Sequence, residues 1–214
     1  MQTQTLTFAQ QIDIVIKEFK TVGNFDKYKW MRLVILDSLP QVLQNIGFRG
    51  DNLTLSVKKF FDILDKHSDE LNEEILKQLP DKIANPLAII KSKSLPNSIV
   101  MIIDLDNENG NKLIVPISLQ DRHPEIDILG ATRLSSIDIS SVYGNDDDDN
   151  PRANELLEYA INSKEVIYID NDLDVYDVLK ELAPDIVYYK QADLYDFKNN
   201  EVKAFYPQPI QNKT

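Results

Sequence analysis

His67 is one of two histidines in this chain, which has no cysteine. It is the only residue in its predicted pair of helices of a type suited to proton transfer near neutral pH. It follows an apolar stripe at helical spacing and precedes Ser68, which could cap a second helix. The stripe consists of Val57, Phe60, Phe61 and Leu64. This spacing predicts His67 at the corner between two helices. There it could be a general acid or base in metal-independent RNA cleavage, or a structural histidine bonded to a backbone carbonyl.

Two further groups of polar residues could contribute to such a site. Strand alternation predicts Lys91 and Lys93 on one face, where they could contact a phosphate, and Ser92 on the other face. A solvated strand end is the alternative. Ser141 and Tyr143 would share one face of a later strand and could point into the same site. Tyr143 could equally bury its ring and use its hydroxyl as a hydrogen-bonding group.

Other candidates carry less chemistry. His123 lies beside Arg122 in a loop that we expect to be exposed. Asp146–Asp149 could bind a divalent cation, but their spacing lacks an EF-hand pattern and favours a solvated acidic loop. The sequence has no Gly-rich phosphate loop, Walker motif, HExxH or GxSxG. We therefore expect no metal and no cofactor.

The elements that must position these residues change in type along the chain. Apolar residues at helical spacing predict a helix from Phe8 to about Gly23 and another around Trp30–Leu36, interrupted by Pro40. The pair of helices around His67 comes next, and Pro80 should stop its second member. These segments predict a helical N-terminal part.

Runs rich in Ile and Val then predict strands. The expected strands are Leu87–Lys93, Ser98–Leu105, Lys112–Leu119, Ile137–Tyr143 and Glu165–Asp170. Asn109–Gly110 predicts a tight hairpin, and Pro116 suggests an edge strand or a bulge. Helices are expected after Pro151 and over Val175–Leu182. The predicted fold class is α+β: a helical N-terminus followed by an antiparallel sheet of four or five strands with flanking helices.

Charge is distributed unevenly. Residues 145–214 carry 16 acidic and 7 basic residues, a net charge of −9, whereas residues 1–144 carry a net charge of −3. An acidic surface repels phosphate backbones, so extensive non-specific nucleic-acid binding is not expected, but this charge distribution leaves room for a compact site that contacts one or two phosphates. We predict a helical accessory segment (1–46), an α+β domain (47–144) and an acidic C-terminal extension packed on that domain (145–214).

The region 47–144 resembles a known family. The resemblance rests on KFFDILDKHSDELNEEILKQLP (Lys59–Pro80), NPLAIIKSKSLPNSIVMIIDLDNENGNKLIVPISL (Asn85–Leu119) and SSVYG (Ser140–Gly144). It is similar to the C-terminal domain of phage MuF-type head-morphogenesis polyproteins, which is grouped with phage members of the barnase/EndoU/colicin/RelE nuclease superfamily. A histidine recurs at the His67 point in that family.

The resemblance implies a phage- or mobile-element-derived protein, with RNA cleavage as a toxin or effector as its activity. His67 would be the acid or base, Lys91 and Lys93 the phosphate contacts, and Ser92, Ser141 and Tyr143 the polar supports. The alternative is a non-catalytic interaction module whose acidic surface binds a basic protein or mimics nucleic acid. The absence of cysteine, of a signal peptide and of a membrane span predicts a cytoplasmic protein with no membrane partner.

Overall fold

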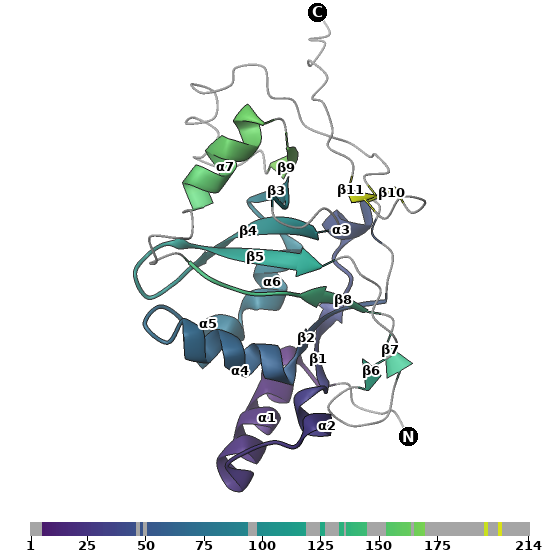
Figure 1. Cartoon of the computed structure of the whole chain (residues 1–214), viewed down its shortest axis with the longest axis vertical. Helices are drawn as coiled ribbons and strands as arrows, with labels where there is room; N and C mark the ends of the chain where they lie inside the picture. The colour runs from purple at the N-terminus through teal and green to yellow at the C-terminus, as the bar shows by residue number, and fades with distance from the viewer. Residues whose placement is uncertain are drawn as a thin grey trace, which may run out of the picture.

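A mixed β-sheet forms the centre of the computed structural model (Figure 1). The structure describes residues 6–45, 48, 51–93, 98–118, 125–126, 133–134, 136–144, 153–163, 165–169, 195–196 and 201–202. Within these residues the sheet has seven strands in the order β1-β2-β8-β5-β4-β3-β9. Neighbouring strands are antiparallel except for β2 and β8, which are parallel.

The strands of this sheet are β1 (Leu33–Ser38), β2 (Asn52–Ser56), β3 (Ala88–Lys91), β4 (Ser98–Asp106), β5 (Lys112–Ser118), β8 (Ser136–Ile139) and β9 (Val166–Ile169). Two short pairs lie apart from it: β6 (Glu125–Ile126) with β7 (Arg133–Leu134), and β10 (Tyr195–Asp196) with β11 (Glu201–Val202). The helices are α1 (Phe8–Val22), α2 (Lys27–Trp30), α3 (Gln41–Asn45), α4 (Val57–Lys66), α5 (Glu73–Leu76), α6 (Leu79–Ala84) and α7 (Ala153–Asn162). The predicted α+β class is confirmed.

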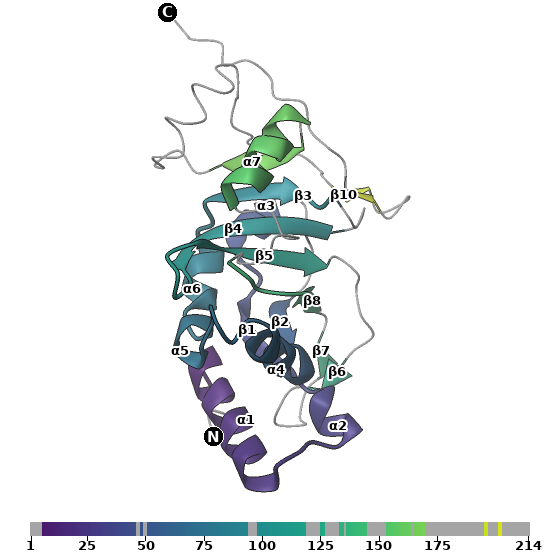
Figure 2. The same ribbon diagram turned by 60° about the vertical axis from the view of Figure 1, so that its left-hand side comes forward.

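Two buried clusters lie on the two faces of the sheet. The larger cluster packs α1, α4, α5 and α6 against one face, with Ile12, Phe60 and Ile83 fully buried. The smaller cluster packs α7 against the other face through Leu157 and Ala160. Figure 2 shows α7 next to β3, with α1 and α4 at the β1–β2 end of the molecule. Successive side chains of a strand point to opposite faces of the sheet, and apolar residues cover both faces. This explains why β3 and β4 are apolar at nearly every position.

The predicted helix around Trp30–Leu36 is wrong, because Leu33–Ser38 forms β1. A short apolar run rich in branched residues fits a buried strand as well as a helix, and here pairing with β2 decides the outcome. The Gln11 side chain covers the other edge of β1. Its Nε2 donates to the Ile35 carbonyl (2.9 Å), and the Ile35 N–H donates back to its Oε1 (3.0 Å). A helix side chain therefore takes the place of a neighbouring strand.

The segment after His67 also differs from the prediction. Asn72, rather than Ser68, caps the next helix by accepting a hydrogen bond from the Ile75 N–H (2.9 Å). Pro80 lies at the start of α6 and does not end a helix, since proline tolerates the first helical turn. The single predicted helix is therefore divided into α5 and α6.

The β4–β5 hairpin is confirmed, and Gly110 adopts a left-handed φ of 78° in its turn. Pro116 does not mark an edge, because β5 lies between β4 and β8. Its carbonyl accepts from the Ser140 N–H (2.8 Å) just past the end of β8, so its missing N–H falls where the β5–β8 ladder stops. The expected fourth strand ends at Ile139, and Tyr143 pairs with Ile114 as an isolated bridge.

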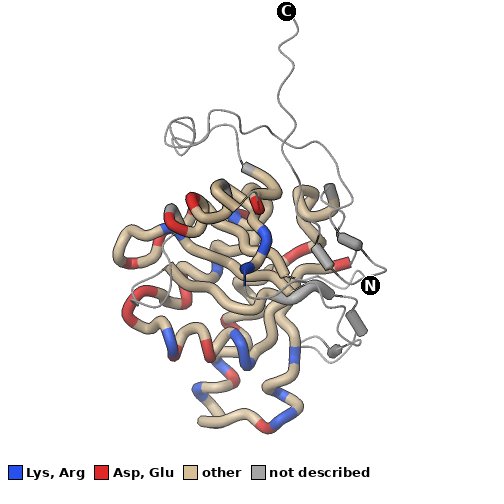
Figure 3. Tube along the Cα trace, turned by 45° about the horizontal axis from the view of Figure 1, so that its top comes forward, with Lys and Arg blue, Asp and Glu red and all other residues tan. Residues whose placement is uncertain are grey.

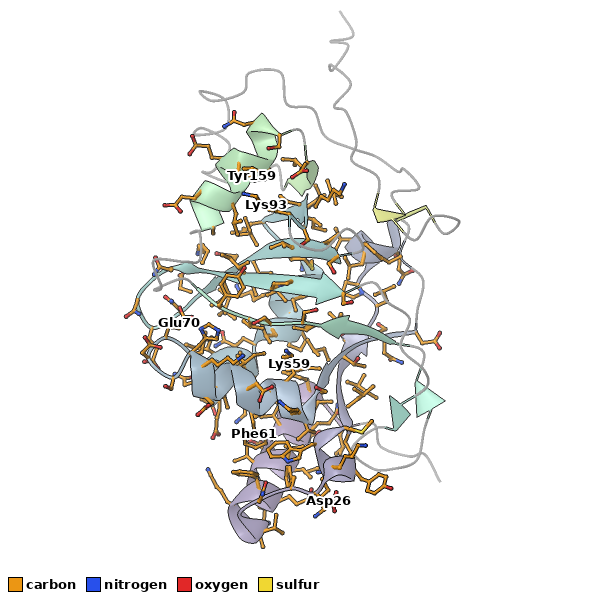
Figure 4. The ribbon with its side chains drawn as sticks, in the orientation of Figure 1. Asp26, Lys59, Phe61, Glu70, Lys93 and Tyr159 are labelled. Carbon is orange, nitrogen blue, oxygen red and sulfur yellow. The ribbon has the colours of Figure 1, made fainter. Side chains whose placement is uncertain are left out.

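An aromatic cluster fastens α4 to the N-terminal helices. The Phe61 ring lies 4.5 Å from the Phe19 ring of α1 and 5.6 Å from the Trp30 ring of α2, measured between ring centroids. Figure 4 labels Phe61 between α4 and these two helices. The N-terminal segment thus shares the main core and supports the helix that ends at His67.

Several expectations lie outside the described residues, namely those for His123, Asp146–Asp149 and the helix over Val175–Leu182. The helix expected after Pro151 and the strand expected at Glu165–Asp170 correspond to α7 and β9. Throughout the described part of the chain, every helix is too short or too polar to cross a membrane.

Candidate functional site

His67 lies at the end of α4, where the chain turns towards α5. Its N–H donates to the Ile63 carbonyl (3.0 Å), and its own carbonyl accepts from the N–H groups of Glu70 (3.1 Å) and Leu71 (2.7 Å). The helix corner predicted for His67 is therefore present. The backbone is hydrogen-bonded on both sides of the residue, so the point from which the imidazole projects is fixed.

The buried carboxylate of Glu70 orients this imidazole. His67 Nδ1 lies 2.8 Å from Glu70 Oε1, and the Glu70 side chain is only 2% exposed, whereas that of His67 is 16% exposed. An ionised carboxylate only accepts hydrogen bonds, so His67 donates from Nδ1. Its Nε2 is then the ring nitrogen that can exchange a proton with a substrate.

The second oxygen of Glu70 is held from two other parts of the chain. Asn107 Nδ2 donates to Oε2 (2.8 Å), and the Gly144 backbone N–H donates to the same atom (3.1 Å). Three donors thus converge on one buried carboxylate, which satisfies a group that would otherwise be costly to bury. The arrangement joins α4, the β4–β5 hairpin and the segment after β8 in one hydrogen-bonded network.

Asn107 is itself fixed by the hairpin turn in which it lies. Its Oδ1 accepts from the N–H groups of Asn109 (3.0 Å) and Asn111 (2.8 Å), so its amide has a defined orientation. The Glu108 N–H also donates to the Glu70 carbonyl (3.0 Å). The asparagine-rich turn therefore holds the Glu70 side chain as well as reversing the chain.

Gly144 is required by close packing against Asn107. A Cβ atom at this position would overlap the Asn107 side chain. The preceding residue is anchored to β5, since the Ile114 N–H donates to the Tyr143 carbonyl (2.7 Å) and the Tyr143 N–H donates back (3.1 Å). Gly144, the last residue of the Ser-Val-Tyr-Gly string, thus contributes its backbone N–H as a hydrogen-bond donor to Glu70.

The Tyr143 ring stacks beside His67, with centroids 6.1 Å apart and an interplanar angle of 23°. Burial raises the pKa of the Tyr143 hydroxyl above its usual value, so this hydroxyl is protonated at neutral pH. Ser141 is half-buried in the same segment, two residues before Tyr143. The structure therefore brings His67 and Tyr143 together, with Ser141 close by in the chain.

Lys91, Ser92 and Lys93 lie at the other end of the sheet. Lys91 pairs with Ile99 of β4, and the stretch of β4 from Ile99 to Asp106, next to the Asn107 turn, spans about 20 Å. These three residues are not brought together with His67. Figure 3 shows basic and acidic positions interspersed along the described elements.

The predicted strand Leu87–Lys93 is shorter in the structure, because β3 ends at Lys91, and strand alternation therefore does not by itself place Lys93 on the face of Lys91. The Lys93 ammonium lies 4.5 Å from the centroid of the Tyr159 ring on α7. Figure 4 labels both residues. Ser92 is buried, and its N–H donates to the Ser98 carbonyl (3.0 Å).

Glu70 and Asn107 belong to this hydrogen-bonded group but were not predicted from the sequence. The spacing of His67 and Glu70, three residues apart at a helix end, was a usable signal, since such residues are neighbours on a helical turn. The role of Asn107 had no local signal, because it depends on a contact across 37 residues. Among the described residues, no group of three or more His, Asp or Glu side chains could hold a metal ion.

Comparison with known proteins identifies a family. The family model described as the phage MuF-C-terminal domain matches residues 63–172, just over half of the chain. The match begins within α4 and extends past β9, so it includes His67, Glu70, Asn107, Tyr143 and Gly144. No curated protein and no solved structure matches the chain.

Proposed function

The chain belongs to the phage MuF C-terminal domain family, and from this premise we propose that it is a metal-independent RNA-cleaving toxin or effector of the barnase-like superfamily. Family membership makes it a phage or mobile-element type of protein. The observation that supports the activity is the buried carboxylate of Glu70, which fixes His67 Nδ1 at 2.8 Å. A histidine held by a buried carboxylate is the usual arrangement for a general base.

In the proposed reaction, His67 Nε2 accepts the proton of a ribose 2′-hydroxyl. The 2′-oxygen attacks the adjacent phosphorus while the bond from phosphorus to the 5′-oxygen of the next nucleotide breaks. The leaving 5′-oxygen takes up a proton from water, and His67 releases to water the proton that it accepted, so that the products are a 2′,3′-cyclic phosphate and a 5′-hydroxyl. No redox step and no metal ion is needed for this exchange.

Glu70 would serve as a positioning residue. Its negative charge stabilises the imidazolium that forms when Nε2 takes the proton, and its fixed position selects the ring orientation. The protonated hydroxyl of Tyr143, whose ring stacks beside the imidazole, would donate a hydrogen bond to a phosphate oxygen, and Ser141 would supply a second hydroxyl from the same segment. These assignments keep Tyr143 and Ser141 as polar supports.

The test is degradation of a mixed cellular RNA in the presence of EDTA by the wild-type protein and by His67→Ala. We expect the wild type to degrade the RNA and the variant to be at least about 100-fold slower, since general acid–base groups contribute about that much or more. Lys58→Met is a matched control, because Lys58 is exposed on the same helix and pairs with Asp62. Equal degradation by wild type and His67→Ala would exclude His67 as the acid or base.

The second candidate function is a non-catalytic interaction module. The observation that favours it is the acidic C-terminal third, in which 16 acidic residues accompany 7 basic ones and Glu158 is exposed on α7. Such a surface would bind a basic partner through long-range attraction. Salt-sensitive binding of polylysine by the full chain, together with intact RNA after incubation, is the expected outcome for this function and would exclude the nuclease.

A further inference from the structure

Two adjacent lysines on α4 have different environments. Lys58 is exposed, and its Nζ lies 2.6 Å from Asp62 Oδ2 one helical turn away. Lys59 is half-buried, and among the described residues no carboxylate lies within ion-pair distance of it. Within the described part of the chain, the Lys59 ammonium is thus not already paired with a neighbouring carboxylate, as that of Lys58 is, so Lys59 is the better candidate for a bound anion.

The position of Lys59 relates it to His67. Residues 59, 63 and 67 follow one another at intervals of four, so they lie along one side of the helix. The rise of a helix separates Lys59 and His67 by about 12 Å along the axis. Ile63 between them is buried, which explains why the aliphatic part of Lys59 is half-covered. In Figure 4, Lys59 and Glu70 are both labelled on the side of α4 towards the sheet.

We propose that Lys59 binds a backbone phosphate of the RNA at or next to the bond that His67 cleaves, an inference that rests on the proposed function. A lysine side chain and an imidazole on the same side of a helix can reach one phosphate or two neighbouring ones over this separation. Lys59 would then fill the role expected of Lys91 and Lys93. Lys93 instead stacks on Tyr159, and both of those lysines lie at the far end of the sheet.

The contact is electrostatic and independent of base sequence. A phosphate contact releases a counter-ion from the nucleic acid, so its loss lowers the salt dependence of binding as well as the affinity. Removal of the contact should weaken binding about tenfold, which is typical of a hydrogen bond to a charged group. The slope of log affinity against log salt concentration should fall by about 0.7 for a single strand.

The experiment measures binding of a mixed-sequence single-stranded oligoribonucleotide by fluorescence anisotropy at several salt concentrations. Every protein carries His67→Ala, so the RNA is not cleaved. Lys59→Met should show the loss of affinity and of slope, Lys59→Arg should keep the affinity, and Lys58→Met should match the parent. Melting temperatures check that each variant is folded, and Lys59→Gln replaces Lys59→Met if the latter unfolds.

The outcomes separate this inference from the function on which it rests. Binding by the parent that is weakened equally by the Lys58 and Lys59 variants, or by neither, would overturn the role of Lys59 and leave RNA cleavage standing. No binding of RNA by the parent, together with no cleavage by the wild type, would overturn both. A selective loss in the neutral Lys59 variant, with retention in Lys59→Arg, supports the phosphate contact.

Discussion

In the proposed reaction His67 exchanges its proton through Nε2, because Nδ1 lies 2.8 Å from Glu70 Oε1. Replacing Glu70 by Gln tests this point without changing the size of the side chain. Asn107 and Gly144 would still donate to the position that Oε2 occupies in Glu70, so the amide oxygen of the glutamine would take that position. The amide NH₂ would then face Nδ1 of His67. Nδ1 would then have to accept, and the proton of the neutral ring would move to Nε2.

We therefore expect Glu70→Gln to lose RNA cleavage by about 100-fold or more while remaining folded. Nitrogen NMR of the imidazole should show the proton on Nδ1 in the wild type and on Nε2 in the variant. An unchanged tautomer with unchanged cleavage would mean that Glu70 only fastens the helix corner to the hairpin.

Tyr143 offers a test that depends on pH. Burial raises the pKa of its hydroxyl, so ionisation is harder in the folded protein than in the unfolded chain. The stability linked to this group is present below the ordinary tyrosine pKa of about 10 and is lost as pH rises through the higher value of the folded state. Denaturation across this alkaline range should show a steeper loss of stability for the wild type than for Tyr143→Phe. Parallel curves would contradict the burial of the hydroxyl.

Among single residues, the sequence indicated His67 and Tyr143, which lie side by side in the structure, but it did not indicate the residues that hold His67 in place. His67 and Tyr143 stood out by residue type, since few side chains in the chain could do this chemistry. Glu70 and Asn107 were not predicted as part of the site. Their shared role depends on hydrogen bonds between segments that are distant in the sequence.

The segment after β8 supports the site through its backbone, since the Gly144 N–H donates to the buried carboxylate of Glu70. Gly144→Ala would force a Cβ into the Asn107 side chain. We expect a loss of about 2 kcal/mol in the free energy of unfolding, as for other overpacked sites, together with reduced cleavage because Glu70 shifts. Chemical denaturation and the RNA assay measure the two effects.

Gly110→Ala is the matched control, because Gly110 has a left-handed φ but open space around its Cβ position. It should cost about 1 kcal/mol in stability and leave cleavage by the folded protein unchanged. Equal loss of cleavage in the two variants would mean that the hairpin as a whole, rather than the Gly144 contact, supports the site.

The elements were predictable where one local signal dominated. The Ile- and Val-rich runs predicted β3, β4 and β5, and Asn109–Gly110 predicted the hairpin between them. Leu33–Ser38 could not be assigned in this way, because its structure depends on pairing with β2 and on the Gln11 side chain. The prediction for Pro116 was wrong for a similar reason, since the point at which β8 ends is not visible in the local sequence.

At the scale of the whole molecule, the N-terminal segment and the sheet share one hydrophobic core. Deleting residues 1–46 would remove α1 and β1 and uncover the apolar surface of Phe60 and Leu55, which are fully buried. We expect the remaining chain to lose cooperative thermal unfolding, measured by circular dichroism. The full chain with Ile12→Ala should keep a single transition and lose about 2–5 kcal/mol. A truncated protein that unfolds cooperatively would show that the segment is a dispensable accessory.

We propose that His67, held by Glu70, starts RNA cleavage at a ribose 2′-hydroxyl. The most direct measurement is the chemistry of the new RNA ends after a mixed RNA has been treated in EDTA. We expect 2′,3′-cyclic phosphate and 5′-hydroxyl ends with the wild type and neither kind of end with His67→Ala. We also expect no cleavage of RNA whose 2′-hydroxyls are methylated. Absence of new ends with the folded wild-type protein, ends that persist in His67→Ala, or cleavage of the methylated RNA would contradict the proposal.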